Sequence, residues 1–347
     1  MTKILLCLLG ALIFCPAAAV AQWVEQPSGT DVRLRGVSAV SARVAWASGD
    51  RGTYLRTTDG GKTWRAGVVP GAEALDFRDV DAFDERTAYL LAIGEGERSR
   101  VYKTTDGGRT WRLQFTNQHP SGFFDCMAFW DRRRGLAVSD PVGGRFLIIT
   151  TEDGGRTWRE SPASGMPPAL EGEGAFAASG TCVAVRGERN AWFGTGGPGG
   201  ARVFRTTDGG RTWKVSMTPL AHGKSAGVFS LAFITPESGV AVGGDYTKEG
   251  EATASAAFTR DGGRTWRLAD GPPRGYRSGL ALFGNTPAAP LIAVGPSGAD
   301  LTLDGGQNWR QVGYRGFHAV SFAGEDGWAV GEKGLVARYD KSLGKRP

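Results

Sequence analysis

Acidic residues and tyrosines in irregular loops give this 347-residue sequence its candidate chemistry. Paired carboxylates act as general acid and base in glycoside hydrolysis, and some of these enzymes use tyrosine as the nucleophile. The candidate acids are Asp125, Asp140, Glu173 and Asp245, and the candidate nucleophiles are Tyr246 and Tyr276. Nothing in their spacing demands catalysis. A glycan-hydrolysing or glycan-binding protein is therefore the alternative interpretation, and if the chain is an enzyme we expect a glycoside hydrolase.

Metal and cofactor motifs are not found in the sequence. Its three histidines, His119, His222 and His318, have neither HxH nor HExxH spacing and no adjacent cysteine. The glycine-rich stretch 194–200 stands between two expected strands and opens no helix, unlike a dinucleotide-binding fingerprint. We expect no metal and no cofactor.

The elements that position the candidate acids and tyrosines are marked by six near-identical segments: TTDGGKTW, TTDGGRTW, TEDGGRTW, TTDGGRTW, TRDGGRTW and TLDGGQNW. Their aspartates are 43 to 55 residues apart, a period suited to one four-stranded propeller blade per repeat. In such an Asp box the carboxylate accepts hydrogen bonds from its own turn, the glycines adopt positive φ, and the tryptophan anchors the next strand. Six equivalent turns cannot converge on one substrate, so we assign them a structural role. The box residues are Asp59, Trp64, Asp106, Trp111, Asp153, Trp158, Asp208, Trp213, Asp261, Trp266, Asp304 and Trp309.

Short strands recur around each box, and we name them A to D from the ring axis outward. A seventh unit after Trp309 ends before any box or outer strand, whereas Gln22–Glu25 supplies an unmatched strand containing Trp23. The sequence therefore predicts an all-β fold, a seven-bladed β-propeller of four-stranded antiparallel blades. It spans residues 22–340, its N-terminal strand completes the last blade, and residues 341–347 form a short tail.

The long insertions fall in the D–A and B–C connections, which share one face of a propeller, opposite the A–B turns and the boxes. Near the axis they predict a polar mouth that binds a partner, with a merely solvated rim as the alternative. The expected mouth residues are Arg78, Asp79, Asp125, Asp140, Arg145, Glu173, Asp245, Tyr246, Tyr276, Arg277 and His318.

Cys126 and Cys182 occupy matching places in strand A of adjacent units. A disulfide requires their Cα atoms to lie within about 7 Å. The sequence leaves two interpretations open, a disulfide or two small buried side chains.

The first 21 residues have the pattern of a secretory signal: Lys3, an apolar run from Ile4 to Phe14, and Ala19-Val20-Ala21. We predict cleavage after Ala21, a periplasmic or secreted protein, and no membrane insertion after cleavage. The formal charge of +6 is spread over many arginines rather than gathered in a stripe, so we expect no nucleic-acid partner. We expect a monomer.

The boxes, the blade motifs GWAVGEKG and RVAWASGD, and the leader followed by one propeller resemble the photosystem II stability/assembly factor family of BNR-repeat propellers. The resemblance covers Gln22 to Asp340. It implies a non-enzymatic scaffold that recognises a protein partner and assists assembly or stability of an envelope complex on the lumenal or periplasmic side.

Overall fold

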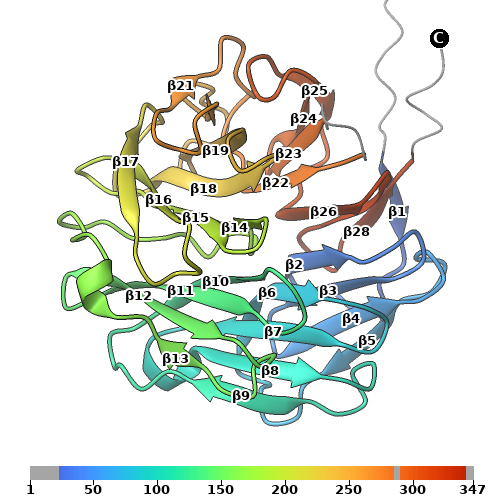
Figure 1. Cartoon of the computed structure of the whole chain (residues 1–347). Coiled ribbons are helices and arrows are strands. Elements are labelled where there is room, and N and C mark those ends of the chain that lie inside the picture. The colour runs from blue at the N-terminus through green and yellow to red at the C-terminus, as the bar shows by residue number, and fades with distance from the viewer. Residues whose placement is uncertain (1–22, 285–289, 341–347) are drawn as a thin grey trace, which may run out of the picture.

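The computed structural model describes residues 23–284 and 290–340. These residues form seven four-stranded antiparallel sheets arranged in a ring, with two short 3-10 turns (Figure 1). The predicted seven-bladed propeller is confirmed. The expected leader at 1–21, its cleavage point and the tail at 341–347 lie outside the described residues. Within the described residues, no helix is long and apolar enough to span a bilayer.

Each blade runs from an innermost strand A to an outermost strand D. Blade 1 has β2 (Leu34–Ala39), β3 (Ala45–Gly49), β4 (Thr53–Thr57) and β5 (Arg65–Val68). Blade 2 has β6 (Asp76–Ala82), β7 (Ala88–Ile93), β8 (Arg100–Thr104) and β9 (Arg112–Thr116), with η1 (Gly96–Arg98) between β7 and β8. Blade 3 has β10 (Phe124–Phe129), β11 (Gly135–Val142), β12 (Arg145–Thr151) and β13 (Arg159–Glu160), followed by η2 (Ala163–Gly165).

The remaining four blades repeat this order. Blade 4 has β14 (Val183–Arg186), β15 (Asn190–Gly194), β16 (Ala201–Thr206) and β17 (Lys214–Thr218). Blade 5 has β18 (Ala226–Phe233), β19 (Gly239–Asp245), β20 (Ala256–Thr259) and β21 (Arg267–Leu268). Blade 6 has β22 (Gly279–Leu282), β23 (Leu291–Gly295), β24 (Gly298–Thr302) and β25 (Arg310–Gly313). Blade 7 has β26 (Ala319–Ala323), β27 (Asp326–Val330), β28 (Val336–Tyr339) and β1 (Trp23–Gln26).

The hydrophobic core lies between neighbouring blades rather than in one central cluster. One such layer joins Cys126, Val138 and Ile148 of blade 3 to Phe193 of blade 4. Strand β18 reads AGVFSLAF and is buried at every position, because neighbouring blades cover both of its faces. Outer strands such as β5 are mostly exposed.

The repeated turns between strands C and D are closed by their own side chains. In the first, the Asp59 carboxylate accepts hydrogen bonds from the Thr63 backbone N–H (3.0 Å) and the Thr57 hydroxyl (2.9 Å). Hydrogen bonds from Thr63 lower the pKa of Asp59 to about 2. Gly60 and Gly61 both have positive φ, and the Gly60 N–H donates to the Arg43 carbonyl of the A–B turn (2.9 Å). The A–B and C–D turns therefore share one face, the box face, and the D–A and B–C connections form the opposite mouth face.

Strand β1 closes the ring by pairing antiparallel with β28, so that the blue and red ends of the chain lie side by side in Figure 1. Trp23 packs its ring against Phe317 (5.2 Å between centroids) and Tyr339 (5.5 Å). The Gln26 Oε1 atom accepts hydrogen bonds from the indole N–H groups of Trp64 (3.0 Å) and Trp328 (3.1 Å). One side chain of the closing strand thus links blade 7 to blade 1.

Side chains of the A strands bind the backbone of the next blade. Ser321 accepts from the Ala39 N–H (3.0 Å) and Ser38 accepts from the Ala82 N–H (3.1 Å), each through its hydroxyl oxygen. The third such contact uses a carboxyl group, because Asp81 accepts from the Phe129 N–H (3.1 Å). Burial raises the pKa of Asp81 to about 7, which makes this interface sensitive to pH.

Replacing Trp23 by alanine should lower the free energy of unfolding by roughly 3–5 kcal/mol, the usual cost of removing a buried large aromatic side chain. The control is Val24→Ala in the same strand, because Val24 is 50% exposed. Urea denaturation measures both. A Trp23→Ala protein as stable as Val24→Ala would contradict the account of ring closure.

Replacing Asp81 by serine, the residue at the matching positions 38 and 321, should flatten the pH dependence of stability. In the folded chain Asp81 keeps its proton to about pH 7, whereas an unfolded aspartate loses it near pH 4. Its contribution is therefore fully present at low pH and is lost as pH rises from about 4 through 7. Urea denaturation at several pH values should show a smaller decrease for Asp81→Ser than for the unchanged chain. An equal decrease in both proteins would argue against this role.

Candidate functional site

Four of the inner strands contain a β-bulge near the mouth face. The pairing between strands A and B shifts register around Arg35, Arg78, Asp125 and Phe229, in blades 1, 2, 3 and 5. A bulged residue has no cross-strand partner, and bulges are often used to redirect a side chain near a functional site. Arg35, Arg78 and Phe229 line the pocket described below, and Asp125 is buried.

The D–A connection between blades 3 and 4 enters the interior of the ring, and we call its residues 176–181 the plug. The Ala177 carbonyl accepts a hydrogen bond from Arg78 of blade 2 (2.9 Å), and the Ser179 hydroxyl donates to the Ser278 carbonyl beside blade 6 (2.7 Å). The Thr181 hydroxyl bonds that of Ser230 in blade 5 (2.6 Å). The plug therefore bridges blades on opposite sides of the ring.

A pocket of about 430 Å³ lies over the plug on the mouth face. Three residues of the plug line this pocket: Phe176, Ala177 and Ala178. The other lining residues come from blades 1, 2, 5, 6 and 7 or their connections: Arg35, Arg78, Phe229, Tyr246, Glu249, Tyr276, Ser278, Pro296, His318 and Glu332.

Arg35 is the unusual residue of this pocket. Among the described residues no carboxylate forms an ion pair with it, and its Nε atom is buried without a hydrogen-bond partner. Burial, followed by the nearby Arg78 cation, lowers the pKa of Arg35 to about 10, so the guanidinium remains charged at neutral pH. A desolvated cation without a counter-ion favours an anionic ligand.

The two other basic groups of the pocket have partners. Arg78 pairs with Asp76 (2.8 Å) and holds the plug through the Ala177 carbonyl. His318 lies 3.1 Å from Glu332, and its other ring nitrogen contacts the Leu34 carbonyl (3.1 Å). Burial and the Arg35 cation lower the pKa of His318 to about 4, so it is neutral at pH 7. Arg35 is thus the cation available to a ligand.

Aromatic rings form one wall of the pocket. Phe176 of the plug stacks on Phe229 (3.9 Å between centroids, 17° between planes), and Tyr276 packs edge-on against Phe229 (4.7 Å). Tyr246 lies further out and is 48% exposed. Within the part of the chain that the structure describes, the site therefore combines one cation without an ion-pair partner with an apolar wall, a combination that suits an acidic group on an apolar body.

Of the predicted mouth residues, four line the pocket: Arg78, Tyr246, Tyr276 and His318. Three of the others are carboxylic acids near the plug, of which Asp79 and Asp125 are buried and Asp140 is half-buried. Asp79 accepts a hydrogen bond from the Met127 N–H (2.7 Å), and Asp140 accepts one from the Ala175 N–H (2.8 Å). Burial raises the pKa of Asp140 to about 6, and it raises the pKa values of Asp79 and Asp125 well above the usual range. These groups support the plug from within the ring.

The remaining four predicted residues are held in local structural contacts. Glu173 is buried in an ion pair with Arg202 and accepts a hydrogen bond from Thr195 (2.6 Å). Arg145 donates to the Met166 carbonyl, and Asp245 accepts from the Thr247 N–H within its own turn (2.9 Å).

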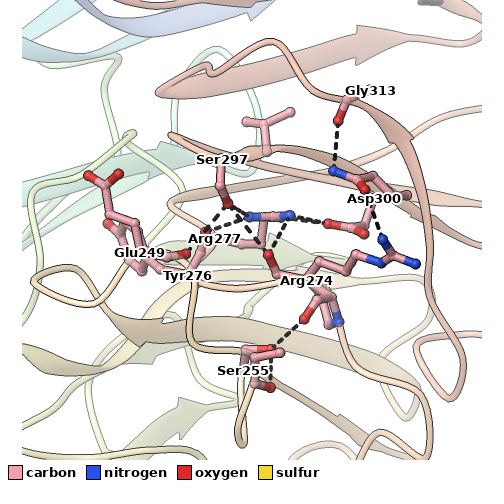
Figure 2. A network of polar contacts seen from close by, with 12 residues as sticks. Glu249, Ser255, Arg274, Tyr276, Arg277, Ser297, Asp300 and Gly313 are labelled. Atoms are coloured by element: carbon pink, nitrogen blue, oxygen red, sulfur yellow. Dashed lines mark hydrogen bonds and ion pairs between the residues drawn. The ribbon is translucent and has the colours of Figure 1, made fainter.

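Arg277 is completely buried, and Figure 2 shows it inside a polar network between blades 5 and 6. Its Nε donates to Asp300 (2.7 Å), its Nη1 donates to the Tyr276 carbonyl (2.8 Å) and the Ser297 hydroxyl (2.9 Å), and its Nη2 donates to Asp300 as well. All of its nitrogens thus have partners in the protein, and the residue is part of the framework.

Sequence reasoning missed several lining residues, above all Arg35 and Phe229. The segments LRGVSAV and FRDVDAF place Arg35 and Arg78 at the same position of strand A, which was the available signal. Phe229 occupies the corresponding bulge in VFSLAF, where a phenylalanine is indistinguishable from a core residue.

Cys126 and Cys182 form a disulfide, with their Cα atoms 6.1 Å apart. Cys182 directly follows the plug, so the bond attaches the end of the plug to strand β10. The three histidines lie apart, and the described residues contain no cluster of three or more potential metal ligands.

Comparisons with known proteins show what this chain is similar to. No family model and no curated protein matches its sequence. A solved structure described as YCF48 bound to D1 peptide superposes with a TM-score of 0.66 at 19% identity, covering 93% of this chain and 98% of that chain. YCF48 from Cyanidioschyzon merolae gives 0.64 at 19% identity, covering 92% and 99%. The WD40 β-propeller domain of Doa1 gives 0.61 at 13% identity, with the same coverage.

These similarities extend over almost the whole chain and establish the propeller fold. The expected resemblance to photosystem II assembly factors is supported at the level of the fold, because two of the similar structures are YCF48.

Replacing Arg277 by methionine should lower the free energy of unfolding by about 3–5 kcal/mol, because it leaves Asp300 as an uncompensated buried charge. The double variant Arg277→Met, Asp300→Leu should recover most of this loss, since neither charge then remains buried. Urea denaturation of both proteins measures the difference. Equal stability of the unchanged chain and Arg277→Met would contradict the framework role.

Proposed function

We propose that this chain is a non-enzymatic scaffold, periplasmic or secreted, that binds an acidic segment of a protein partner at the axial pocket and thereby assists an envelope complex. The observation that carries the proposal is the charged, half-buried guanidinium of Arg35 beside an aromatic wall, with its Nε atom buried and no counter-ion among the described residues. A carboxylate from an Asp or Glu side chain or from a chain terminus supplies the missing anion. The aromatic wall receives the adjoining apolar groups.

The comparison with YCF48 supports a protein ligand, because one of the similar structures is described as YCF48 bound to D1 peptide. The location in the envelope rests on the signal-like sequence of residues 1–21.

The glycan-hydrolase alternative has less support. Its candidate acids Asp125, Asp140, Glu173 and Asp245 do not line the pocket. Asp140, Glu173 and Asp245 hold backbone N–H groups of the protein, and Asp125 is buried. The lining carboxylates are Glu249 and Glu332, and Glu332 faces His318.

Selection from a random peptide library on the immobilised chain should yield peptides with an acidic residue or free carboxyl terminus beside apolar residues. Replacing Arg35 by glutamine should weaken their binding about 10- to 100-fold, the equivalent of losing one charge-assisted hydrogen bond of 1.5–3 kcal/mol. Isothermal titration calorimetry measures the affinities.

The matched control is Arg33→Gln, because Arg33 is a nearby cation already paired with Asp50 (3.2 Å) and lies outside the pocket lining. Arg33→Gln should change the peptide affinity less than about twofold, because an exposed ion pair contributes little free energy. Selection of peptides without acidic groups, or unchanged affinity in Arg35→Gln, would overturn the proposal. Binding of neutral oligosaccharides in place of peptides would favour the glycan alternative.

A further inference from the structure

The box face carries the repeated turns at equivalent heights around the ring. In blades 2, 3 and 4, as in blade 1, the first glycine of the box donates its N–H to the neighbouring A–B turn; the acceptors are the carbonyls of Arg86 (2.9 Å), Arg133 (2.8 Å) and Arg189 (3.0 Å). Because the blades repeat around one axis, these turn tips lie close to one plane.

Cations outnumber carboxylates in most of these turns. The first box region contains Arg56, Lys62 and Arg65 against the single carboxylate of Asp59. The regions around Asp106, Asp208 and Asp261 repeat this ratio of three to one. The excess of positive charge is therefore a property of the face and is not confined to one blade.

The carboxylates of the turns accept hydrogen bonds within their own turns, whereas the cations at the tips are exposed. Asp106 accepts hydrogen bonds from the Thr110 N–H (2.9 Å) and hydroxyl (2.7 Å) of its own turn. The basic residue at the tip is exposed in five boxes, and none of the five has an ion-pair partner within 4.0 Å among the residues described. These tip cations are Lys62, Arg109, Arg156, Arg211 and Arg264.

The arrangement fits a flat anionic surface better than an anionic polymer. Single-stranded nucleic acids are bound by continuous basic grooves with aromatic stacking platforms. Here each tip cation belongs to a separate blade, and the exposed aromatic residues among those described, Tyr246 and Tyr314, lie in mouth-face connections. A membrane surface rich in anionic phospholipid presents its charges in a plane, as the tips do.

We propose that the box face docks onto the anionic headgroups of a phospholipid membrane, which leaves the axial pocket on the opposite face open to a partner. The attraction is electrostatic and reversible, without insertion of the chain into the bilayer. It is independent of what the axial pocket binds, because the two surfaces lie on opposite faces.

The test is cosedimentation with vesicles of phosphatidylcholine alone or with 30% phosphatidylglycerol. Every protein in it begins at Gln22, because the apolar segment 4–14 could bind lipid by itself, whereas the ring is complete from β1 onward. The unchanged chain should bind the anionic vesicles in about 0.05 M salt and be released near 1 M, where the Debye length falls to about 3 Å. It should not bind phosphatidylcholine alone.

Changing all five tip cations to glutamine, the residue at the same position of the sixth box, should weaken binding at least tenfold. The control changes five exposed cations of the mouth face to glutamine, with the same loss of net charge: Arg51, Arg98, Lys224, Arg274 and Lys333. This control should bind within about threefold of the unchanged chain. Thermal melts followed by circular dichroism establish that both variants fold.

Three outcomes would overturn the proposal. The first is no binding of the unchanged chain to anionic vesicles at low salt. The second is an equal loss in both variants, which would make net charge rather than the box face responsible. The third is release of the chain from the vesicles by an equal charge of heparin or single-stranded DNA, which would identify a polymer as the preferred partner.

Discussion

Closure of the ring by β1 is the constraint on which the other features depend. A four-stranded blade cannot bury its inner strands alone, because each blade is covered by its two neighbours, so an open ring would expose two apolar faces. The Trp23 ring fills the last blade, and Gln26 bonds the indoles of Trp64 and Trp328 on either side of the closure. Once closed, the ring fixes the axis around which the bulged strands place Arg35, Arg78 and Phe229.

The plug converts a ring of similar blades into a molecule with one distinct site. Without it, the inner strands would surround a channel, and the repeat itself favours no blade over another. The plug bonds blades 2, 5 and 6 and is attached to blade 3 through the disulfide of Cys182. Its Phe176 then stacks on Phe229, which gives the pocket an aromatic wall beside Arg35, a cation without an ion-pair partner among the residues described.

Much of the fold could be predicted from the sequence, because six copies of one turn at a regular period define the blades, and the unmatched Trp23 strand defines the closure. The site could be predicted only in part. A bulge is a property of pairing between strands, so the sequence did not distinguish Arg35 from an ordinary strand residue. Arg277 and Glu173 are predicted as mouth residues because they lie in D–A connections, but each has a buried partner of opposite charge, Asp300 for Arg277 and Arg202 for Glu173. The path of the plug across the ring is likewise set by its hydrogen bonds to distant blades. The sequence of the loop alone does not predict these contacts.

Site-specific photo-crosslinking in the cells that make the protein tests the central claim most directly. A photoreactive residue at position 246, on the rim of the axial pocket, is compared with one at position 207, an exposed threonine beside a box turn. The account predicts that position 246 captures a protein, that mass spectrometry places the adduct within a few residues of an acidic side chain or carboxyl terminus, and that position 207 captures no protein. Protein adducts from position 207 alone, or adducts from position 246 that lie far from any acidic group, would contradict it.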